Sequence, residues 1–399
     1  MFAVVGPGLL AGLSDDDPAG ITTYSVLGAD HGYQLLWVLL LSTVALVLFH
    51  GLAERMGVVT GQGLIGLVRQ RYGVRLGGGA LAALVVANVG TTCAEFAGIA
   101  AGSEIFGISR YASVPAAATL VSILVLRGSF HRVEHFLLAL ATVFLAYVAS
   151  GVLARPDWGA ALYGLLVPTM PGGGAAIAIV TATVGTTLAP WGLSFIQSYA
   201  VDKKLRTDDL ALERVDVASG AILTGVIGFF VVVACAATLH RAGRPIRDAA
   251  DAAVALQPLA GDAASTLFAV GLLGAALLAA SVLPLSTAYS VCEYVGVEAA
   301  VDDSFDEARP FYLTFGGVTL VGAGAVLLPG APLVTILVAT QVLNAVLLIP
   351  ILLAMIGIAR DRDLMGSFAV GRAGTVAYGV TTAVVLACVA ALAVTSLTG

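Results

Sequence analysis

Three consecutive carboxylates, Asp15, Asp16 and Asp17, stand in the stretch SDDDPAGITT, directly after a short apolar run. An aspartate in the apolar core of a bilayer costs roughly 3 kcal/mol or more unless it is paired or faces water or an ion. No lysine or arginine lies in the same apolar segment to pair with them. Carboxylate oxygens are ligands that hard divalent cations prefer, and two carboxylates balance a doubly positive charge. The stretch therefore predicts a cation site, and a solvated loop is the alternative.

A second stretch, GTTLAPWG, carries the same kind of interruption much later in the chain. Pro18 and Pro190 each remove a backbone donor and clash with the preceding helical turn, and Gly20 and Gly192 weaken what remains. Both helices should therefore be broken near mid-membrane. Matched breaks in two halves of a chain indicate an inverted-repeat transporter, whose freed carbonyls and half-helix ends face one central site.

Composition sets the surroundings of these two stretches. The 399 residues are 59% hydrophobic and only 11% charged, with a mean hydropathy of +0.99, whereas soluble domains carry roughly a quarter charged residues. The apolar runs lack the alternation of lipid-facing strands, so a membrane barrel is excluded. Helices are predicted in the runs at about 21–50, which divides near Gly32, and at 79–107, 112–126, 133–154, 175–200, 216–239, 264–298, 311–328, 331–358 and 374–397.

The short run Phe2–Leu13 is too brief to span alone and joins the first of these helices, which gives eleven transmembrane helices. The expected fold class is an all-α polytopic membrane protein of the LeuT type, a 5+5 inverted repeat with broken helices 1 and 6. We expect one transmembrane domain over residues 1–399, with repeats at about 1–155 and 175–358 and an extra helix at 374–397.

Positive charges predict the orientation. An amino terminus in the cytoplasm places fourteen Lys and Arg residues in cytoplasmic loops and five on the opposite side, which agrees with the positive-inside rule. We therefore expect a multi-pass protein of the cytoplasmic membrane with a cytoplasmic amino terminus. The five residues on the opposite side are Arg110, Arg155, Arg241, Arg244 and Arg247.

Several classes of function are excluded. A net charge of −6 and an isoelectric point near 5.3 argue against nucleic acid as a partner. The four cysteines stand singly in apolar runs, without metal-finger or disulfide spacing. No nucleophile and base motif occurs, so we expect neither an enzyme nor a cofactor. The expected partners are the lipid bilayer and a transported ion, with no obligate protein partner, and the lack of a basic leader argues against a cleaved signal peptide.

The chain resembles the NRAMP family of divalent-metal transporters along nearly all its length. The opening GPGLLAGLSDDDPAG is similar to the family's Gly-Pro-Gly entry and its Asp-Pro-Gly-Asn metal motif, and GADHGYQLLWVLLLS to the stretch that completes helices 1 and 2. Further similar stretches are RMGVVTGQGL in the first cytoplasmic loop, CAEFAG in helix 3, GTTLAPWG in helix 6 and ATQVLNAVLLIPILLAMIGIARDRDLMG in helix 10 and the turn after it. The resemblance implies that a divalent metal ion is the substrate.

This sequence keeps only part of the metal-ligand set of the family that it resembles. The family's aspartate corresponds to Asp17, and its asparagine falls on Gly20, which offers no side-chain ligand. The family's helix 6 ligands, an alanine carbonyl and a methionine thioether, fall on Thr186 and Ala189. Loss of the soft thioether should weaken a preference for transition metals, and Gly20 and Ala189 supply room for a larger, partly hydrated ion. Gln341 matches a helix 10 glutamine that can approach the ion.

The groups that the resemblance links to proton movement are also incomplete. Glu95 matches the family's helix 3 glutamate, but the aspartate three residues earlier becomes Thr92, and the helix 6 histidine becomes Trp191. Proton coupling is therefore expected to be weak or absent. Asp16 is the expected supporting carboxylate of the metal site, and Asp15 adds negative charge to the pathway.

Other polar residues have two readings each. Gln197 either binds the ion or bonds a backbone carbonyl. Asn344 and Gln341 share a helix face, and we expect one to line the pathway and the other to join helices. A solvated or interfacial position near a helix end is expected for three histidines, His50, His131 and His135.

The leading hypothesis is a secondary transporter that moves a divalent cation, Mg²⁺ or Mn²⁺, by alternating access. The departures at Gly20, Thr186 and Ala189 are similar to those of NRAMP-related proteins that carry magnesium and also dispense with the methionine. An amino-acid or amine carrier of the same architecture is the alternative, although three aspartates would repel a substrate carboxylate. A metal sensor would need an appended signalling domain, which we do not expect here.

Overall fold

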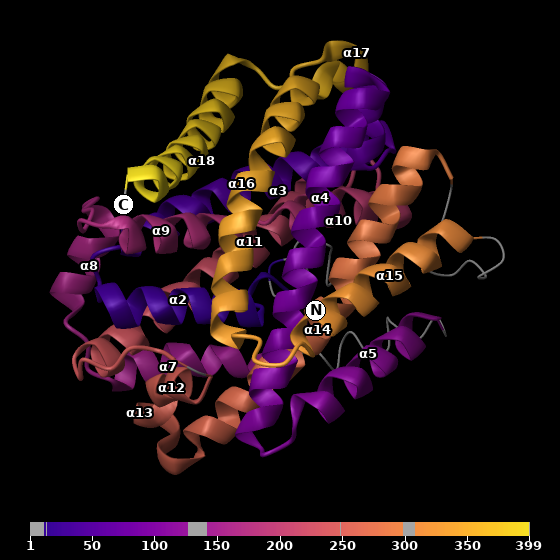
Figure 1. Cartoon of the computed structure of the whole chain (residues 1–399). Coiled ribbons are helices and arrows are strands. Elements are labelled where there is room, and N and C mark those ends of the chain that lie inside the picture. The colour runs from indigo at the N-terminus through magenta and orange to yellow at the C-terminus, as the bar shows by residue number, and fades with distance from the viewer. Residues whose placement is uncertain (1–11, 13, 127–141, 248, 298–307, 399) are drawn as a thin grey trace.

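Helices make up the whole of the regular structure that is described. The computed structural model describes residues 12, 14–126, 142–247, 249–297 and 308–398, and within these ranges every regular element is helical (Figure 1). The longer helices are α2 (Pro18–His31), α3 (Leu36–Thr60), α4 (Leu64–Ile105), α5 (Arg110–Leu126), α7 (Ala146–Leu153), α8 (Trp158–Leu166), α9 (Gly174–Thr187), α10 (Pro190–Asp202), α11 (Leu210–Cys235), α14 (Ala264–Val295), α15 (Arg309–Val326), α16 (Leu333–Ala359) and α18 (Arg372–Thr398). Short elements are η1 (Thr142–Leu145), η2 (Ala236–His240), α12 (Ala249–Ala253), η3 (Val254–Leu256), α13 (Gln257–Ala260), η4 (Gly261–Ala263), α17 (Arg362–Met365) and η5 (Gly366–Phe368).

The observed helices follow the predicted spans. Within the described ranges, seven helical stretches are long and apolar enough to cross a membrane: Leu36–Thr60, Leu64–Ile105, Gly174–Asp202, Leu210–His240, Ala249–Val295, Leu333–Ala359 and Arg372–Leu397. The shorter helices α5 and α15 occupy the predicted spans at 112–126 and 311–328. Most of Phe2–Leu13 and the first part of the span at 133–154 lie outside the described residues, and α7 forms the end of the latter.

Both predicted helix breaks are present. In the first helix Asp16 and Asp17 are not helical, and α2 begins at Pro18. In the second, α9 stops before Leu188, which has φ −114° and ψ 68°, and α10 begins at Pro190. A proline at the first position of a helix costs no hydrogen bond, because the backbone N–H of another residue there would have no partner inside the helix. The prolines therefore end one helical segment and start the next.

Small residues bring the broken helices against their neighbours. Figure 1 shows α2 and α9 side by side, with α16 crossing both. Gly98 of α4 lies against the ring of Pro18, and a Cβ added to Gly185 of α9 would lie 2.6 Å from the amide nitrogen of Ala345 in α16. Helices in lipid associate through this kind of close packing because no hydrophobic effect drives them together. The two breaks are therefore held between α4 and α16.

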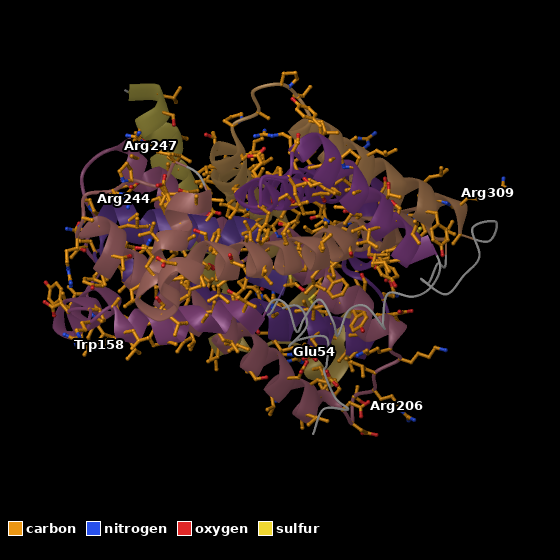
Figure 2. The ribbon with its side chains drawn as sticks, turned by 90° about the horizontal axis from the view of Figure 1, so that it is seen from below. Glu54, Trp158, Arg206, Arg244, Arg247 and Arg309 are labelled. Carbon is orange, nitrogen blue, oxygen red and sulfur yellow. The ribbon has the colours of Figure 1, made fainter. Side chains whose placement is uncertain are left out.

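Charged residues mark two opposite sides of the bundle. Figure 2 shows Arg244 and Arg247 on one side and Arg206 and Arg309 on the other. This is the same division that the sequence predicts for the loops that carry these four residues.

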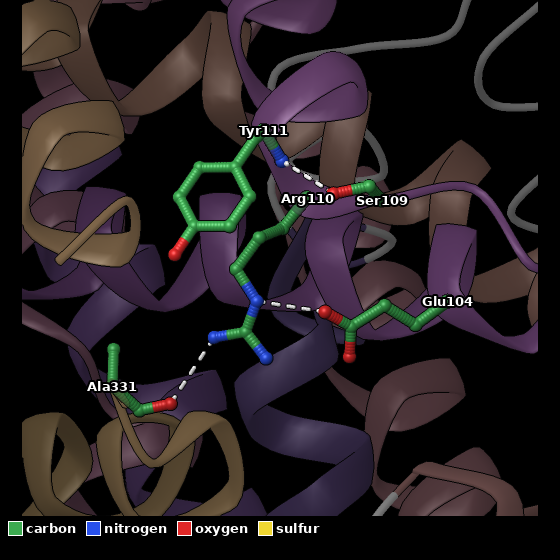
Figure 3. A network of polar contacts seen from close by, with 5 residues as sticks. All are labelled: Glu104, Ser109, Arg110, Tyr111 and Ala331. Atoms are coloured by element: carbon green, nitrogen blue, oxygen red, sulfur yellow. Dashed lines mark hydrogen bonds and ion pairs between the residues drawn. The ribbon is translucent and has the colours of Figure 1, made fainter. Parts of the chain in front are cut away.

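A polar network ties two loops together on the side of Arg247. Arg110 Nε donates to Glu104 Oε1 at 2.7 Å, and its Nη1 donates to the carbonyl of Ala331 at 3.2 Å (Figure 3). The backbone N–H of Tyr111 donates to Ser109 Oγ at 3.3 Å in the same turn. Arg110 and Arg247 line one cavity of about 300 Å³. The network joins the α4–α5 turn to the α15–α16 turn.

Candidate metal-binding site

The break in the first helix buries all three aspartates. Asp15, Asp16 and Asp17 have exposed fractions of 2%, 1% and 3%. Asp17 caps α2, because its Oδ1 accepts the backbone N–H of Gly20 at 2.6 Å. The carboxylate oxygens of Asp15 and Asp16 have no hydrogen-bond partner among the described residues. Buried carboxylates without partners are costly, so this arrangement favours a cationic ligand.

Oxygens from both breaks surround Gly20. A Cβ placed on Gly20 would lie 2.8 Å from the carbonyl oxygen of Asp15, 3.3 Å from Asp17 Oδ1 and 3.4 Å from Thr186 Oγ1. The Thr186 hydroxyl is buried and has no hydrogen-bond partner among the described residues. That Gly20 supplies room for an ion remains a prediction. The lack of a Cβ allows the backbone carbonyl of Asp15 to approach α2, with two side-chain oxygens beside it.

The second break supplies further backbone groups. Ala189 is the residue before α10 and has an extended conformation, with φ −77° and ψ 142°. The last carbonyls of a helix have no partner inside it, and of those at the end of α9 the Val184 carbonyl accepts the backbone N–H of Leu188 at 3.0 Å. Trp191 follows as part of the core, with an exposed fraction of 1% and a carbonyl that accepts Ser286 Oγ at 3.2 Å.

The two residues of α4 that were assigned to the pathway, Glu95 and Thr92, have different surroundings. Glu95 is fully buried, and its carboxyl group faces that of Asp17. The Thr92 hydroxyl donates to the carbonyl of Asn88 at 2.7 Å, and its methyl group lies against Gly322 of α15. Glu95 therefore belongs to the surroundings of Asp17, whereas Thr92 serves the α4–α15 contact.

The two amides of α16 belong to one hydrogen-bond network. Asn344 Nδ2 donates to Gln341 Oε1 and to Thr91 Oγ1, both at 2.9 Å. Gln341 Nε2 donates to Thr340 Oγ1 at 3.1 Å. Asn344 therefore joins α16 to α4, as one of the two amides was expected to do. The carbonyl of Gln341 lies directly against Gly185, beside the end of α9.

Gln197 of α10 contacts the α3–α4 connection. Its Nε2 donates to the carbonyl of Gln62 at 2.9 Å, in the α3–α4 connection. This contact matches the second reading of the sequence, in which Gln197 bonds a backbone carbonyl.

His50 contradicts the expectation of an interfacial position. Its exposed fraction is 1%, and neither ring nitrogen has a hydrogen-bond partner among the described residues. The apolar run stops at His50 in the sequence, but α3 continues to Thr60 and places His50 well inside the bundle. Hydropathy missed this continuation because the polar residues Glu54 and Arg55 follow within the same helix. His131 and His135 lie outside the described residues.

In the part of the chain that the structure describes, acidic and nitrogen-bearing side chains do not form a complete metal site by themselves. Over the described ranges, no group of three or more His, Cys, Asp or Glu side chains is arranged to hold a metal ion. A bound ion would therefore take the rest of its ligands from carbonyls, hydroxyls and water. Oxygen ligands of this kind suit Mg²⁺, Ca²⁺ and Mn²⁺.

Two broken helices with buried oxygens between them define a membrane transporter of the LeuT type. The fold is similar to that of a manganese transporter of Eremococcus coleocola, solved with an aromatic bis-isothiourea substituted compound, at a TM-score of 0.79 and 18% identity over 97% of this chain and 86% of that one. A nucleobase-cation-symport-1 family transporter with bound bromovinylhydantoin is similar at a TM-score of 0.57 and 16% identity, over 98% of this chain and 92% of that one. The predicted fold class is confirmed.

Sequence comparison then gives the family. Residues 8–395 match the Nramp family, described as natural resistance-associated macrophage protein-like, and the chain belongs to this family. A relative in Burkholderia ambifaria, named divalent metal cation transporter MntH, is 29% identical over 399 aligned positions that cover 97% of this chain and 87% of the relative. Family members are metal transporters and not enzymes, with the metal as substrate and not as cofactor, which confirms both expectations.

Proposed function

We propose that this chain carries a divalent metal cation, Mn²⁺ or Mg²⁺, across the cell membrane by alternating access. The convergence of three oxygens at Gly20 carries the proposal: the Asp15 carbonyl, the Asp17 carboxylate and the Thr186 hydroxyl. They come from both broken helices, so an ion between them would link the two half-helix pairs. Relatives named as divalent metal and manganese transporters support the same substrate class.

Asp17 is the principal ligand in this proposal, and Asp16 is the supporting carboxylate. The carbonyls near Thr186 and Ala189 complete the ligand shell together with water, and Gln341 approaches it from α16. Repeats at about 1–155 and 175–358 would rock against one another around this site, with the amino terminus in the cytoplasm. The alternative, a carrier of amino acids or amines, is disfavoured because unpaired aspartates repel a substrate carboxylate.

Measuring which ions are taken up tests the proposed substrate. The purified full chain in proteoliposomes should take up Mn²⁺ and Mg²⁺, and each ion should compete with the other. The ligands described at the site are oxygens, and there is no thioether sulfur among them to favour a soft ion. Empty liposomes and liposomes with Asp17→Asn serve as controls. Uptake of Cd²⁺ at far lower concentrations than either ion would contradict the proposal.

Proton coupling is tested in the same vesicles with a pH-sensitive dye in the lumen. The side chains of Thr92 and Trp191 carry no group that takes up or releases a proton near neutral pH, and they stand where the family has an aspartate and a histidine. We expect uptake of Mn²⁺ without acidification of the lumen. Acidification that depends on the metal and disappears without it would show that coupling exists and that this expectation is wrong.

A further inference from the structure

The side chains of His50 and Asp15 both lie close to Gly192. His50 Nε2 lies 3.1 Å, and Asp15 Oδ1 3.7 Å, from the position that a Cβ of Gly192 would occupy. The imidazole comes from α3, the carboxylate from the first helix before its break, and Gly192 from the first turn of α10. Three separate segments thus meet at one point.

Neither side chain has a partner that explains its burial. Both are at most 2% exposed, and both ring nitrogens and both carboxylate oxygens lack a hydrogen-bond partner among the described residues. A buried polar group left without a partner costs about 1–3 kcal/mol. An imidazole nitrogen and a carboxylate oxygen that face the same point are a suitable pair of ligands for a cation with water in its remaining positions.

We propose that His50 and Asp15 form a second station for a divalent transition-metal cation, next to the site at Asp17. This inference rests on the proposed transport function and specifies its substrate further. Imidazole suits transition metals, whereas Mg²⁺ keeps oxygen ligands and several waters. The station therefore favours Mn²⁺ over Mg²⁺ and supplies a nitrogen ligand in a protein that lacks the thioether.

A polar cavity lies further along α10, beyond the station. The helices α3 and α10 stay close as far as Gly57, where an added Cβ would lie 2.7 Å from the carbonyl of Gln197. A cavity of about 650 Å³ follows next to this contact, with Ser198 and Glu293 in its lining. Gly192 and Ser198 are separated by about 9 Å along α10. The second station thus lies between the Asp17 site and this polar cavity.

Pulsed electron paramagnetic resonance of Mn²⁺ tests the station directly, because a nitrogen ligand modulates the electron-spin echo. The full chain in lipid nanodiscs, loaded with Mn²⁺ alone, should show coupling to ¹⁴N. The pattern should change to that of ¹⁵N when only histidine is labelled with ¹⁵N. Bound Mn²⁺ without any nitrogen coupling would overturn the second station and leave the proposed transport function intact, whereas no bound Mn²⁺ at all would count against that function.

Variants identify the histidine that supplies the nitrogen ligand. His50→Gln should lose the coupling, and His240→Gln should keep it, because the His240 Nδ1 already contacts the carbonyl of Ala29 at 2.9 Å. Asp17→Asn should retain the nitrogen-coupled ion while transport is lost. Coupling that survives in His50→Gln, or disappears in Asp17→Asn, would overturn the inference. If His50→Gln does not fold, Asp15→Asn in histidine-labelled protein decides in the same way, since it should lose the coupled ion.

Discussion

Replacing Asp17 separates its role in the fold from its role in ion binding. In the structure its carboxylate accepts the Gly20 N–H at 2.6 Å and so caps α2. Asparagine caps helices about as well as aspartate, whereas alanine costs about 1 kcal/mol. Asp17→Asn should therefore leave the free energy of unfolding nearly unchanged, and Asp17→Ala should lower it by about that amount.

Ion binding should respond to the charge of Asp17 and not to the cap. Two unit charges 4 Å apart interact by about 4 kcal/mol at an effective dielectric constant of ~20. A divalent ion in direct contact with the carboxylate should lose at least this much when the charge is removed. The loss corresponds to binding that is about a thousandfold weaker. Both Asp17→Asn and Asp17→Ala should show it, since both lack the charge.

Calorimetric titration of the full chain with Mn²⁺ measures the affinity, and thermal unfolding measures the fold. Asp157 offers a matched control, because its Oδ1 caps α8 by accepting the Ala160 N–H at 2.9 Å at an exposed position. Asp157→Asn and Asp157→Ala should repeat the effects on stability without an effect on affinity. Asp17→Asn protein that binds as many Mn²⁺ ions as the wild type, each with an affinity within threefold, would refute the assignment of Asp17 as a ligand.

Two further changes test the surroundings of the site. Thr186→Val removes a buried hydroxyl without a partner among the described residues. We expect it to weaken Mn²⁺ binding by about 1 kcal/mol without a loss of thermal stability. Unchanged affinity in calorimetry would show that Thr186 is not a ligand. Gly185→Ala places a Cβ 2.6 Å from the Ala345 nitrogen, so α9 must move away from α16 at a cost of about 1–3 kcal/mol. The control Gly316→Ala adds a Cβ that meets nothing within 4 Å, and equal unfolding temperatures for the two variants would contradict the packing argument.

Hydropathy was enough to locate the spans because lipid imposes its length and composition on each helix. Pro18 and Pro190 were enough to locate the breaks, since proline acts on its own helix. The position of His50 depends instead on how far α3 extends, and the Glu54 and Arg55 that follow concealed that extension. Contacts between distant segments, such as that of Thr92 with α15, have no local signal in a single sequence.

Gly20, which stands where the family has an asparagine, also shows that a single sequence does not reveal contacts between segments. The contact at Gly20 bears on which ion the site selects. Sequence alone suggests that an oxygen ligand has been lost, but the carbonyl oxygen of Asp15 lies 2.8 Å from the position that a Cβ of residue 20 would occupy. In the proposed site one neutral oxygen takes the place of another, so we do not expect this exchange by itself to move the site toward a different ion. Two other features change the kind of ligand: the thioether is absent at Ala189, and the imidazole of His50 supplies a nitrogen. Selectivity between Mn²⁺ and Mg²⁺ should therefore depend more on His50 than on Gly20, because only nitrogen distinguishes the two ions among the donors on this pathway.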